Sequence, residues 1–301
     1  MSATLLVRRP GQSRPAQAGD TTSLDQHQQP VAFVLTGGAG HGAGQVGMLQ
    51  ALAAAGIVPD LLVGSSAGAL NAVAYAGSPT PAGLQRLVDA WRGARRAEVF
   101  PLHPSDLLPA MLGRRDHMIS PLGLRRWVTT HLELDLLEHA VIPVHVVATD
   151  LATGRAVVIS AGEAVSALMA SSAVPSLFPP VALDGRLLVD GSVSADTPVT
   201  QAAELGAHTI YVLPTHAVGG APFPRTAAGL ALYAYLQISA NWSRDQATAT
   251  GGSTVHLLPA PDLHGISPFN LSAAGDLITA GRLATESWLT STAQPRLAVA
   301  A

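Results

Sequence analysis

The feature that most constrains this chain is a pair of continuous apolar runs, each followed by glycines and a helix-forming stretch. The runs are VAFVLT at 31–36 and DLLVGS at 60–65. A run without polar alternation is typical of a strand that is buried on both faces. Helices are expected over 43–55, ending at Gly56, and over 66–76. Strand, turn and helix repeated twice in this short stretch predict an α/β fold that opens with parallel strands.

The alternation continues along the chain, without an internal repeat or an interdomain linker. We expect further elements as a helix over 81–96, a helix from Ser120-Pro121 to about His131, two strands within 143–160, a helix over 164–171, a strand over 187–189, a helix over 198–205, a strand over 209–213 and helices over 226–245 and 272–290. One domain over 30–301 is therefore predicted, with its motifs in 31–213 and a helical part over 226–290. Residues 1–29 are polar and lack apolar periodicity, which predicts a disordered tail.

Composition excludes several kinds of site. Hydrophobic residues make up 48% of the chain and charged residues 12%, so a large core can be buried. A formal net charge of -3 argues against a nucleic-acid-binding surface, which needs a basic stripe. The chain has no cysteine, which excludes disulfides, thiolate zinc sites and a cysteine nucleophile. The eleven histidines show no metal-binding spacing such as H-E-x-x-H, so no metal site is expected.

The N-terminal stretch reaches arginine at Arg8 without a long apolar run, so it does not predict a signal peptide. The most apolar later stretch, 230–240, is too short to cross a bilayer of about 30 Å. We therefore expect a cytoplasmic protein.

Gly64-Ser65-Ser66-Ala67-Gly68 fits the pattern G-x-S-x-G between a predicted strand and a predicted helix. In this motif the glycines leave room for a strained turn that raises the central serine above the edge of the sheet. The alternative is a serine that only caps the helix. The position of Ser66 directly after DLLV favours a nucleophile, and Ser65 occupies the variable position of the motif.

A second glycine cluster, Gly37-Gly38-Ala39-Gly40-His41-Gly42, follows the first strand. Successive small residues leave N–H groups pointing into a concavity that fits an anion, either a phosphate or an oxyanion. The residues 42–47 also match the dinucleotide pattern G-x-G-x-x-G. That match begins six residues after the strand, and the second strand does not end in the acid that binds ribose. An oxyanion hole explains both glycine clusters, whereas a dinucleotide site explains one.

A serine hydroxyl needs a general base. Asp190 follows the predicted strand LLV and precedes Gly191-Ser192, where it could reach the G-x-S-x-G turn, although Asp-Gly is also an ordinary turn dipeptide. His216 lies just beyond the predicted strand 209–213. It could complete a triad Ser66–Asp190–His216 in the chain order of α/β-hydrolases, although Ser66 follows the second strand, which is early for that fold.

Together these residues give the chain a resemblance to patatin-like phospholipases from Val31 to about Leu213. GGAGHG (37–42) resembles the oxyanion-hole motif of the family, GSSAG (64–68) its nucleophile turn and DGS (190–192) its D-G-G/A turn. ATDLATG (148–154) and ASSAVPSLFPPV (170–181) resemble two further stretches typical of the family. The order and spacing of the five pieces are more specific than any one of them.

The resemblance implies a three-layer α/β/α fold with a mainly parallel central sheet, and a Ser–Asp dyad without a catalytic histidine. Ser66 is then the nucleophile, Asp190 the general base, and the amides of Gly37, Gly38, Ala39 and Gly40 hold the oxyanion. The glycines of the three motifs would shape the turns, namely Gly42, Gly64, Gly68 and Gly191. No metal or organic cofactor enters this scheme, and the substrate would be a lipid or another carboxylic ester.

Three positions depart from the family pattern. His41 stands where the family usually has Arg or Lys, Ala39 replaces a glycine, and Ser192 stands where Gly or Ala is usual. We expect these changes to affect rate and substrate rather than mechanism, because the backbone donors remain and only positive charge near the oxyanion is lost.

Two classes of function therefore compete: a lipid acyl hydrolase, and a non-hydrolytic lipid-binding or regulatory protein of the same fold. The presence of both Ser66 and Asp190 favours the hydrolase. Apolar residues in 97–119 are expected either to contact a membrane surface transiently or to pack in the core, namely Phe100, Leu107, Leu108 and Met111. The sequence predicts no oligomeric state.

Overall fold

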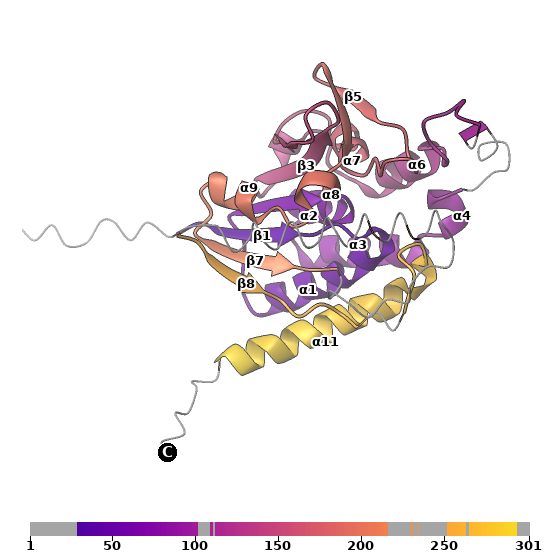
Figure 1. Ribbon diagram of the computed structural model, residues 1–301. Coiled ribbons are helices and arrows are strands. Elements are labelled where there is room, and N and C mark those ends of the chain that lie inside the picture. The colour runs from indigo at the N-terminus through magenta and orange to yellow at the C-terminus, as the bar shows by residue number, and fades with distance from the viewer. Residues whose placement is uncertain are drawn as a thin grey trace, which may run out of the picture.

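The computed structural model describes residues 29–101, 109–110, 112–215, 230, 234, 252–262 and 265–293. Within them, one sheet contains eight strands, drawn in Figure 1. The strands are β1 (Val31–Leu35), β2 (Leu61–Ser65), β3 (Val144–Asp150), β4 (Ala156–Ile159), β5 (Val181–Leu183), β6 (Arg186–Asp190), β7 (Thr209–Leu213) and β8 (Thr254–Leu257). The order is β5-β6-β3-β2-β1-β7-β8, with β4 paired to β3. Pairing is parallel from β3 through β2, β1 and β7 to β8, and antiparallel among β3, β4, β5 and β6.

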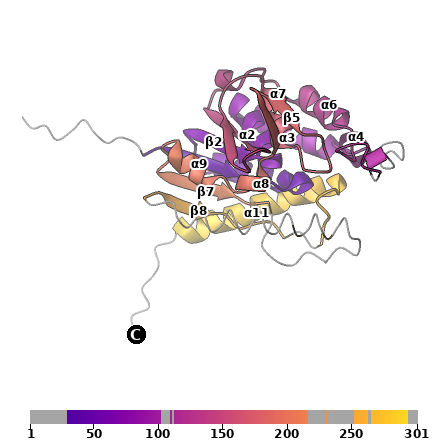
Figure 2. The same ribbon diagram turned by 45° about the horizontal axis from the view of Figure 1, so that its top comes forward.

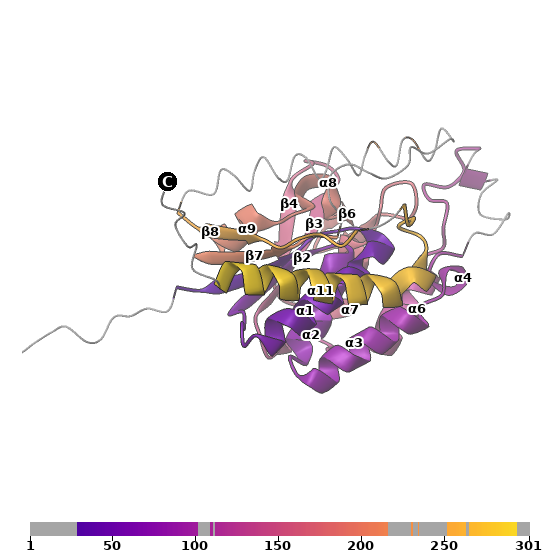
Figure 3. The same ribbon diagram turned by 90° about the horizontal axis from the view of Figure 1, so that it is seen from below.

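Helices cover both faces of this sheet. They are α1 (Ala43–Ala54), α2 (Ala67–Gly77), α3 (Pro81–Gly93), α4 (Arg96–Val99), α6 (Leu122–His131), α7 (Ala164–Ser171), α8 (Ser192–Ala195), α9 (Val199–Glu204) and α11 (Ala274–Ala293), with 3-10 turns η1 (Ala39–Gly42), η2 (Leu137–His139) and η3 (Leu271–Ala273). In Figure 3 the strands lie between α8 and α9 on one side and α1, α2, α3 and α11 on the other, and in Figure 2 α8 and α9 lie on the near side of the strands. This arrangement confirms the predicted three-layer fold.

The apolar runs of the sequence form strands that are buried on both faces. In β1, Ala32 and Val34 pack with residues of α8 and α9, whereas Phe33 and Leu35 pack with the larger helical layer. Side chains of a strand alternate between faces, so a run buried on both sides needs apolar residues at every position. The same alternation occurs in β2, β3 and β7.

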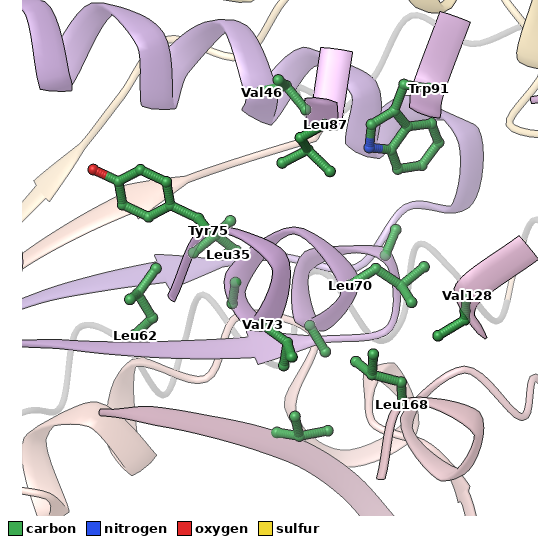
Figure 4. Packing of buried hydrophobic residues seen from close by; sticks show 14 of the residues in the cluster. Leu35, Val46, Leu62, Leu70, Val73, Tyr75, Leu87, Trp91, Val128 and Leu168 are labelled. Atoms are coloured by element: carbon green, nitrogen blue, oxygen red, sulfur yellow. The ribbon is translucent and has the colours of Figure 1, made fainter. Parts of the chain in front are cut away.

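Helix α2 lies at the centre of the larger core. Figure 4 shows Leu70 and Val73 of α2 among side chains from the sheet and from neighbouring helices. Helices α1 and α11, in the same layer, run side by side (Figures 1 and 3). A Cβ at Gly47 would collide with the carbonyl of Ile278, and one at Gly281 with the carbonyl of Gly44. Glycines at these positions allow the two helices to approach closely.

Several predicted boundaries need correction. The expected helix over 81–96 ends at Gly93, and a separate short helix, α4, follows. The part over 226–290 is not wholly helical, because it contains β8, whose four residues lack an apolar run. The short strand β5 was also not predicted. The predicted tail over 1–29 except its last residue, the predicted helix over 226–245 except 230 and 234, and His216 lie outside the described residues.

Candidate active site

The G-x-S-x-G turn and the Asp-Gly turn meet because two strands share one edge of β3. Strand β2 pairs with β3 as far as Ser65 opposite Val147, while β4 occupies the other edge of β3 at the same residues. Strand β6 then pairs with β3 from the opposite direction and ends with Asp190 opposite Ala148. Since β4 also pairs with Ala148, β6 must continue along the edge that β2 leaves. The two strands thus end against each other, which brings Ser66 and Asp190 together.

Ser66 occupies a strained turn between β2 and α2. Its φ of 51° and ψ of -123° lie in a backbone region that residues other than glycine rarely adopt. Its N–H donates to Ser171 Oγ at 2.9 Å, and its carbonyl accepts from the amides of Ala69 and Leu70 in the first turn of α2. Ser171 in turn donates to the carbonyl of Val147. The neighbouring strand and α7 therefore fix the strained backbone.

The motif glycines are needed for close approach of backbone to backbone. A Cβ on Gly64 would lie 2.6 Å from Cα of Ala69, and one on Gly68 would collide with the carbonyl of Leu35. A Cβ on Gly191 would collide with the carbonyl of Val147. Gly42 has a similar role beside α2, because a Cβ there would lie 2.9 Å from Cβ of Ala67.

The hydroxyl of Ser66 donates a hydrogen bond directly to Asp190 Oδ2 at 2.7 Å. Asp190 is 1% exposed, and its Oδ1 accepts from the N–H of Ser192 at 2.8 Å. Burial raises the pKa of Asp190 to about 6, although hydrogen bonds from Ser66 and Ser192 act in the opposite direction. A carboxylate with this pKa is ionised at neutral pH, yet is a stronger base than an exposed aspartate.

Two residues of the glycine loop, Gly38 and Ala39, line the pocket that Ser66 also lines. The amides of Gly38 and Ala39 have no acceptor among the described residues, and both residues line the pocket beside Ser66. Their φ angles of 150° and 49° turn the chain sharply into η1. The amides of Gly37 and Gly40, expected as further oxyanion donors, instead bond to the carbonyls of Asp196 and Pro268 at 3.2 and 2.8 Å.

A buried polar network supports this loop from below. Gln45 donates from Nε2 to the carbonyls of Thr36 and Leu213, both at 2.9 Å. Asn71 donates to the carbonyl of Gly42 and to Gln45 Oε1, and accepts from Trp91 Nε1 at 2.8 Å. Buried amides with satisfied hydrogen bonds fix the local backbone, because breaking one bond leaves a buried polar group unpaired.

His41 contacts the segment that follows residue 265. Its ring is 7% exposed, and Nε2 lies 2.8 Å from the carbonyl of Ile266. It is not among the described residues that line the pocket. Position 41, where the family usually has Arg or Lys, therefore attaches the glycine loop to the segment 265–270.

Ser66 lines a pocket of about 850 Å³ that is partly open to solvent. Its apolar walls come from helices α2, α3, α4 and α6 and from two loops, and include Leu70, Trp91, Val99, Phe100, Leu124, Trp127, Leu177, Phe178, Phe269 and Leu271. Asp190 is the ionisable side chain among its described lining residues. Phe100 packs in this wall, at 5.3 Å between ring centroids from Phe269 and 6.0 Å from Phe178. Leu107, Leu108 and Met111 lie outside the described side chains.

Sequence reasoning missed several residues that shape this site. Ser171, Gln45, Asn71 and Asp196 carry no motif of their own, and each has a hydrogen-bond partner that is far away along the chain. Ser171 had one indirect signal, since it lies in the stretch 170–181 that resembles the family. In the described part of the chain, no group of three or more His, Asp or Glu could hold a metal. No described helix is long and apolar enough to span a membrane.

The chain is similar to several proteins of known sequence. It is 28% identical over 203 residues to "Lysophospholipase NTE1" from Mycosarcoma maydis, covering 66% of this chain and 10% of that protein. It is 26% identical over 185 residues to "Patatin-like phospholipase domain-containing protein 7" from Rattus norvegicus, covering 61% and 13%. It is 27% identical over 169 residues to "Uncharacterized NTE family protein MT2641" from Mycobacterium tuberculosis, covering 56% and 27%. The chain thus spans 10–27% of the lengths of these relatives.

Among solved structures, VipD from Legionella pneumophila matches with a TM-score of 0.47 and 14% identity, over 87% of this chain and 67% of that chain. Residues 33–203, more than half of the chain, match the patatin-like phospholipase family, and this range contains Ser66, Asp190 and all three glycine motifs. The chain therefore belongs to the patatin-like phospholipase family.

Proposed function

We propose that this protein is a serine lipid acyl hydrolase of the phospholipase A or esterase type, which cleaves carboxylic esters through a Ser66–Asp190 dyad. The observation that carries the proposal is the direct hydrogen bond from Ser66 Oγ to Asp190 Oδ2, between two residues that line an apolar pocket. In a triad of the α/β-hydrolase type, a histidine stands between serine and carboxylate. A carboxylate that already accepts the serine proton supports a dyad instead.

The reaction proceeds in two halves. Asp190 takes the proton of Ser66 as Oγ forms a bond to the ester carbonyl carbon, and the carbonyl oxygen becomes an oxyanion. The amides of Gly38 and Ala39 donate to this oxyanion beside apolar walls, where such donors are more effective than in bulk water. The bond to the alcohol then breaks, and Asp190 returns its proton to the leaving oxygen, which leaves an acyl group on Ser66.

Water completes the cycle. Asp190 takes a proton from a water molecule, whose oxygen attacks the acyl carbonyl carbon, and the bond to Ser66 Oγ breaks as that oxygen regains a proton. The products are a carboxylic acid and the restored hydroxyl. The apolar walls of the pocket suit the acyl chain of the substrate, because burial of methylene groups contributes about 0.8 kcal/mol each.

Ser66→Ala and Ser65→Ala form the matched pair that tests this proposal. Both variants remove one buried hydroxyl of the same turn, but Ser66 alone of the two lines the pocket. Ser66→Ala should abolish hydrolysis of a short-chain ester and covalent labelling by a fluorophosphonate, whereas Ser65→Ala should retain both. Comparison of lipid profiles between the wild type and Ser66→Ala would then identify the substrate.

Two outcomes would count against the proposal. Equal loss of labelling in both variants, with unchanged thermal melts, would mean that Ser66 is not the nucleophile. A folded wild type that binds lipid but neither labels nor hydrolyses any ester would favour a non-hydrolytic protein of this fold.

A further inference from the structure

One hydroxyl in the wall of the pocket has no hydrogen-bond partner among the described residues. Within that part of the chain, the buried polar side-chain atoms without a partner are Ser65 Oγ, Trp127 Nε1, Ser172 Oγ, Gln201 Oε1 and His208 Nδ1. Of these residues, Ser172 and Trp127 line the pocket. Ser172 is 6% exposed, whereas Trp127 is half-buried. Burial of a polar group without a partner costs stability, so the hydroxyl of Ser172 needs an explanation.

The backbone of Ser172 is fully hydrogen-bonded. Its N–H donates to the carbonyl of Leu168 at 3.0 Å, and its carbonyl accepts from the N–H of Val174 at 2.9 Å. The adjacent Ser171 uses its hydroxyl twice, since Oγ accepts from the N–H of Ser66 and donates to a carbonyl of β3. Ser172 therefore differs from Ser171 in having a hydroxyl that is available to a ligand.

Hydrogen bonds hold Ser172 beside the Asp190 turn. The residue before it, Ser171, accepts from the N–H of Gly191 at 3.1 Å. The residue after it, Ala173, accepts from the N–H of Asp190 at 2.9 Å. Ser172 thus lies between the two residues that bind the backbone of this turn, and it lines the same pocket as Asp190. The two hydrogen bonds fix the position of Ser172 relative to the proposed general base.

The two oxygens of an ester have different partners in this site. In the reaction proposed above, the carbonyl oxygen accepts from the amides of Gly38 and Ala39, and the alcohol oxygen takes its proton from Asp190. The alcohol oxygen must therefore lie within hydrogen-bond reach of the Asp190 carboxyl when its bond to carbon breaks. Since Ser172 is held beside the same turn, the alcohol oxygen is the substrate atom that its hydroxyl fits.

We propose that Ser172 contacts the substrate, and that its hydroxyl donates a hydrogen bond to the alcohol oxygen of the ester as that oxygen leaves. This inference rests on the proposed function and adds a donor to its first half. The leaving oxygen gains negative charge as its bond to carbon breaks, so a donor at this place lowers the barrier. Asp190 still supplies the proton that this oxygen takes, and Ser172 keeps its own proton, so the products are unchanged.

Ser172 can make this contact without a change of its backbone. Rotation about χ1 moves Oγ among three staggered positions, while the bonds of its N–H and carbonyl stay in place. The alcohol oxygen of an intact ester is a weak acceptor, and it becomes a strong one only as charge develops on it. The hydrogen bond therefore stabilises the transition state more than the bound substrate, which is the condition for catalysis.

Ser172→Ala and Ser65→Ala form the matched pair for this inference. Both remove a buried hydroxyl that has no partner in the described part of the chain, but Ser65 is not among the described residues that line the pocket. The substrates are esters that share one acyl group and differ in their alcohol, from p-nitrophenol to ethanol. Ser172→Ala should lower kcat/KM about 10-fold for the ethyl ester and less than about 2-fold for the p-nitrophenyl ester, whose stable anion needs no donor. Ser65→Ala should keep the wild-type dependence on the alcohol.

Thermal melts and fluorophosphonate labelling separate this contact from a structural role. Since the hydroxyl bonds to no described residue, Ser172→Ala should melt at or above the Tm of the wild type. It should also label at close to the wild-type rate, because fluoride is a good leaving group that needs little help from a donor. A lowered Tm or a loss of labelling would mean that Ser172 supports the fold or the nucleophile, and would overturn the inference.

The ester series distinguishes a failure of this inference from a failure of the proposed function. Loss of kcat/KM by the same factor for every alcohol, or no loss for any, would overturn the contact between Ser172 and the leaving oxygen. Hydrolysis by the wild type that is absent from Ser66→Ala supports the proposed function independently of that result. A wild type that hydrolyses none of the esters would overturn the proposed function, and this inference with it, before Ser172 is varied.

Discussion

The two parts of the proposed active site are held in place in different ways. Ser66 and Asp190 end two strands that pair along one edge of β3, and both lie within residues 33–203, which match the family. The glycine loop instead depends on residues beyond that range, since Thr215 and Pro268 bond to it directly. The register of the sheet fixes the positions of Ser66 and Asp190, whereas segments beyond residue 203 hold the glycine loop and form part of the pocket wall.

This difference predicts how each part responds to substitution. Replacing the hydroxyl of Ser66 or the carboxyl of Asp190 should abolish ester hydrolysis while leaving the sheet folded. A change in the contacts of the glycine loop should reduce the rate gradually, because the backbone donors remain but are less well placed.

The largest effect is expected at Asp190. Asp190→Asn keeps the shape of the side chain but removes the proton acceptor, so kcat on a soluble ester should fall by about 10²–10⁴. In the wild type, activity should also fall as the pH drops below about 6, because the raised pKa of Asp190 leaves the base protonated there. His216→Ala is the control, and a dyad should retain most of its activity. A folded but inactive His216→Ala would support a triad.

Burial raises the pKa of Asp196 to about 6 as well, and the shifts of Asp190 and Asp196 predict a dependence of stability on pH. A carboxyl with a pKa raised from 3.8 to about 6 binds more protons in the folded than in the unfolded protein, so its burial costs stability above pH 6 and not below pH 4. The wild type should therefore lose stability as the pH rises from 4 to 6 on account of these two groups. Urea denaturation should show that Asp190→Asn gains on the order of 1–3 kcal/mol relative to the wild type at pH 8, and less at pH 4.

A smaller effect is expected at His41, which anchors the glycine loop to the segment 265–270. His41→Ala should lower kcat about 10-fold, compared with about 10²–10³ for the loss of a true oxyanion donor. His41→Gln should recover part of this loss because an amide can still bond to the carbonyl of Ile266. His41→Arg should not raise activity, since position 41 does not face the pocket. Loss as complete as that of Ser66→Ala would give the imidazole a direct chemical role.

The smallest effect is expected at Phe269, which lies in the apolar wall beyond the family match. Phe269→Ala should raise KM about 5-fold for long-chain esters and leave short-chain esters unchanged, because only a long chain would reach this wall. Leu283→Ala is a suitable control on the exposed face of α11, where the side chain is 53% exposed. Equal effects on short and long chains would separate Phe269 from acyl-chain binding.

The nucleophile turn could be predicted because its signals are local. Buried strands need apolar residues at every position, and the close backbone contacts at Gly64, Gly68 and Gly191 admit no side chain. Both requirements can be recognised in a few consecutive residues of the sequence. Strand β8 has no continuous apolar run, since its residues are half-buried or exposed at an edge of the sheet. The sequence therefore predicted its neighbourhood as helical.

The oxyanion loop shows the opposite case. Its glycines predicted an anion site, but four donors were expected, and two of them are engaged by the carbonyls of Asp196 and Pro268. Nothing in GGAGHG distinguishes the amides of Gly38 and Ala39 from those of Gly37 and Gly40. The distinction depends on acceptors that arrive from other parts of the chain.

The sequence by itself determined the α/β architecture, the position of the strained serine turn and the Asp-Gly turn that faces it, because each follows from local backbone geometry and burial. Tertiary structure alone decided which amides of the glycine loop are engaged by carbonyls and which side chains line the pocket. These features depend on contacts between residues far apart in the chain, and a hydrogen bond or a pKa is set by whatever neighbours the fold supplies.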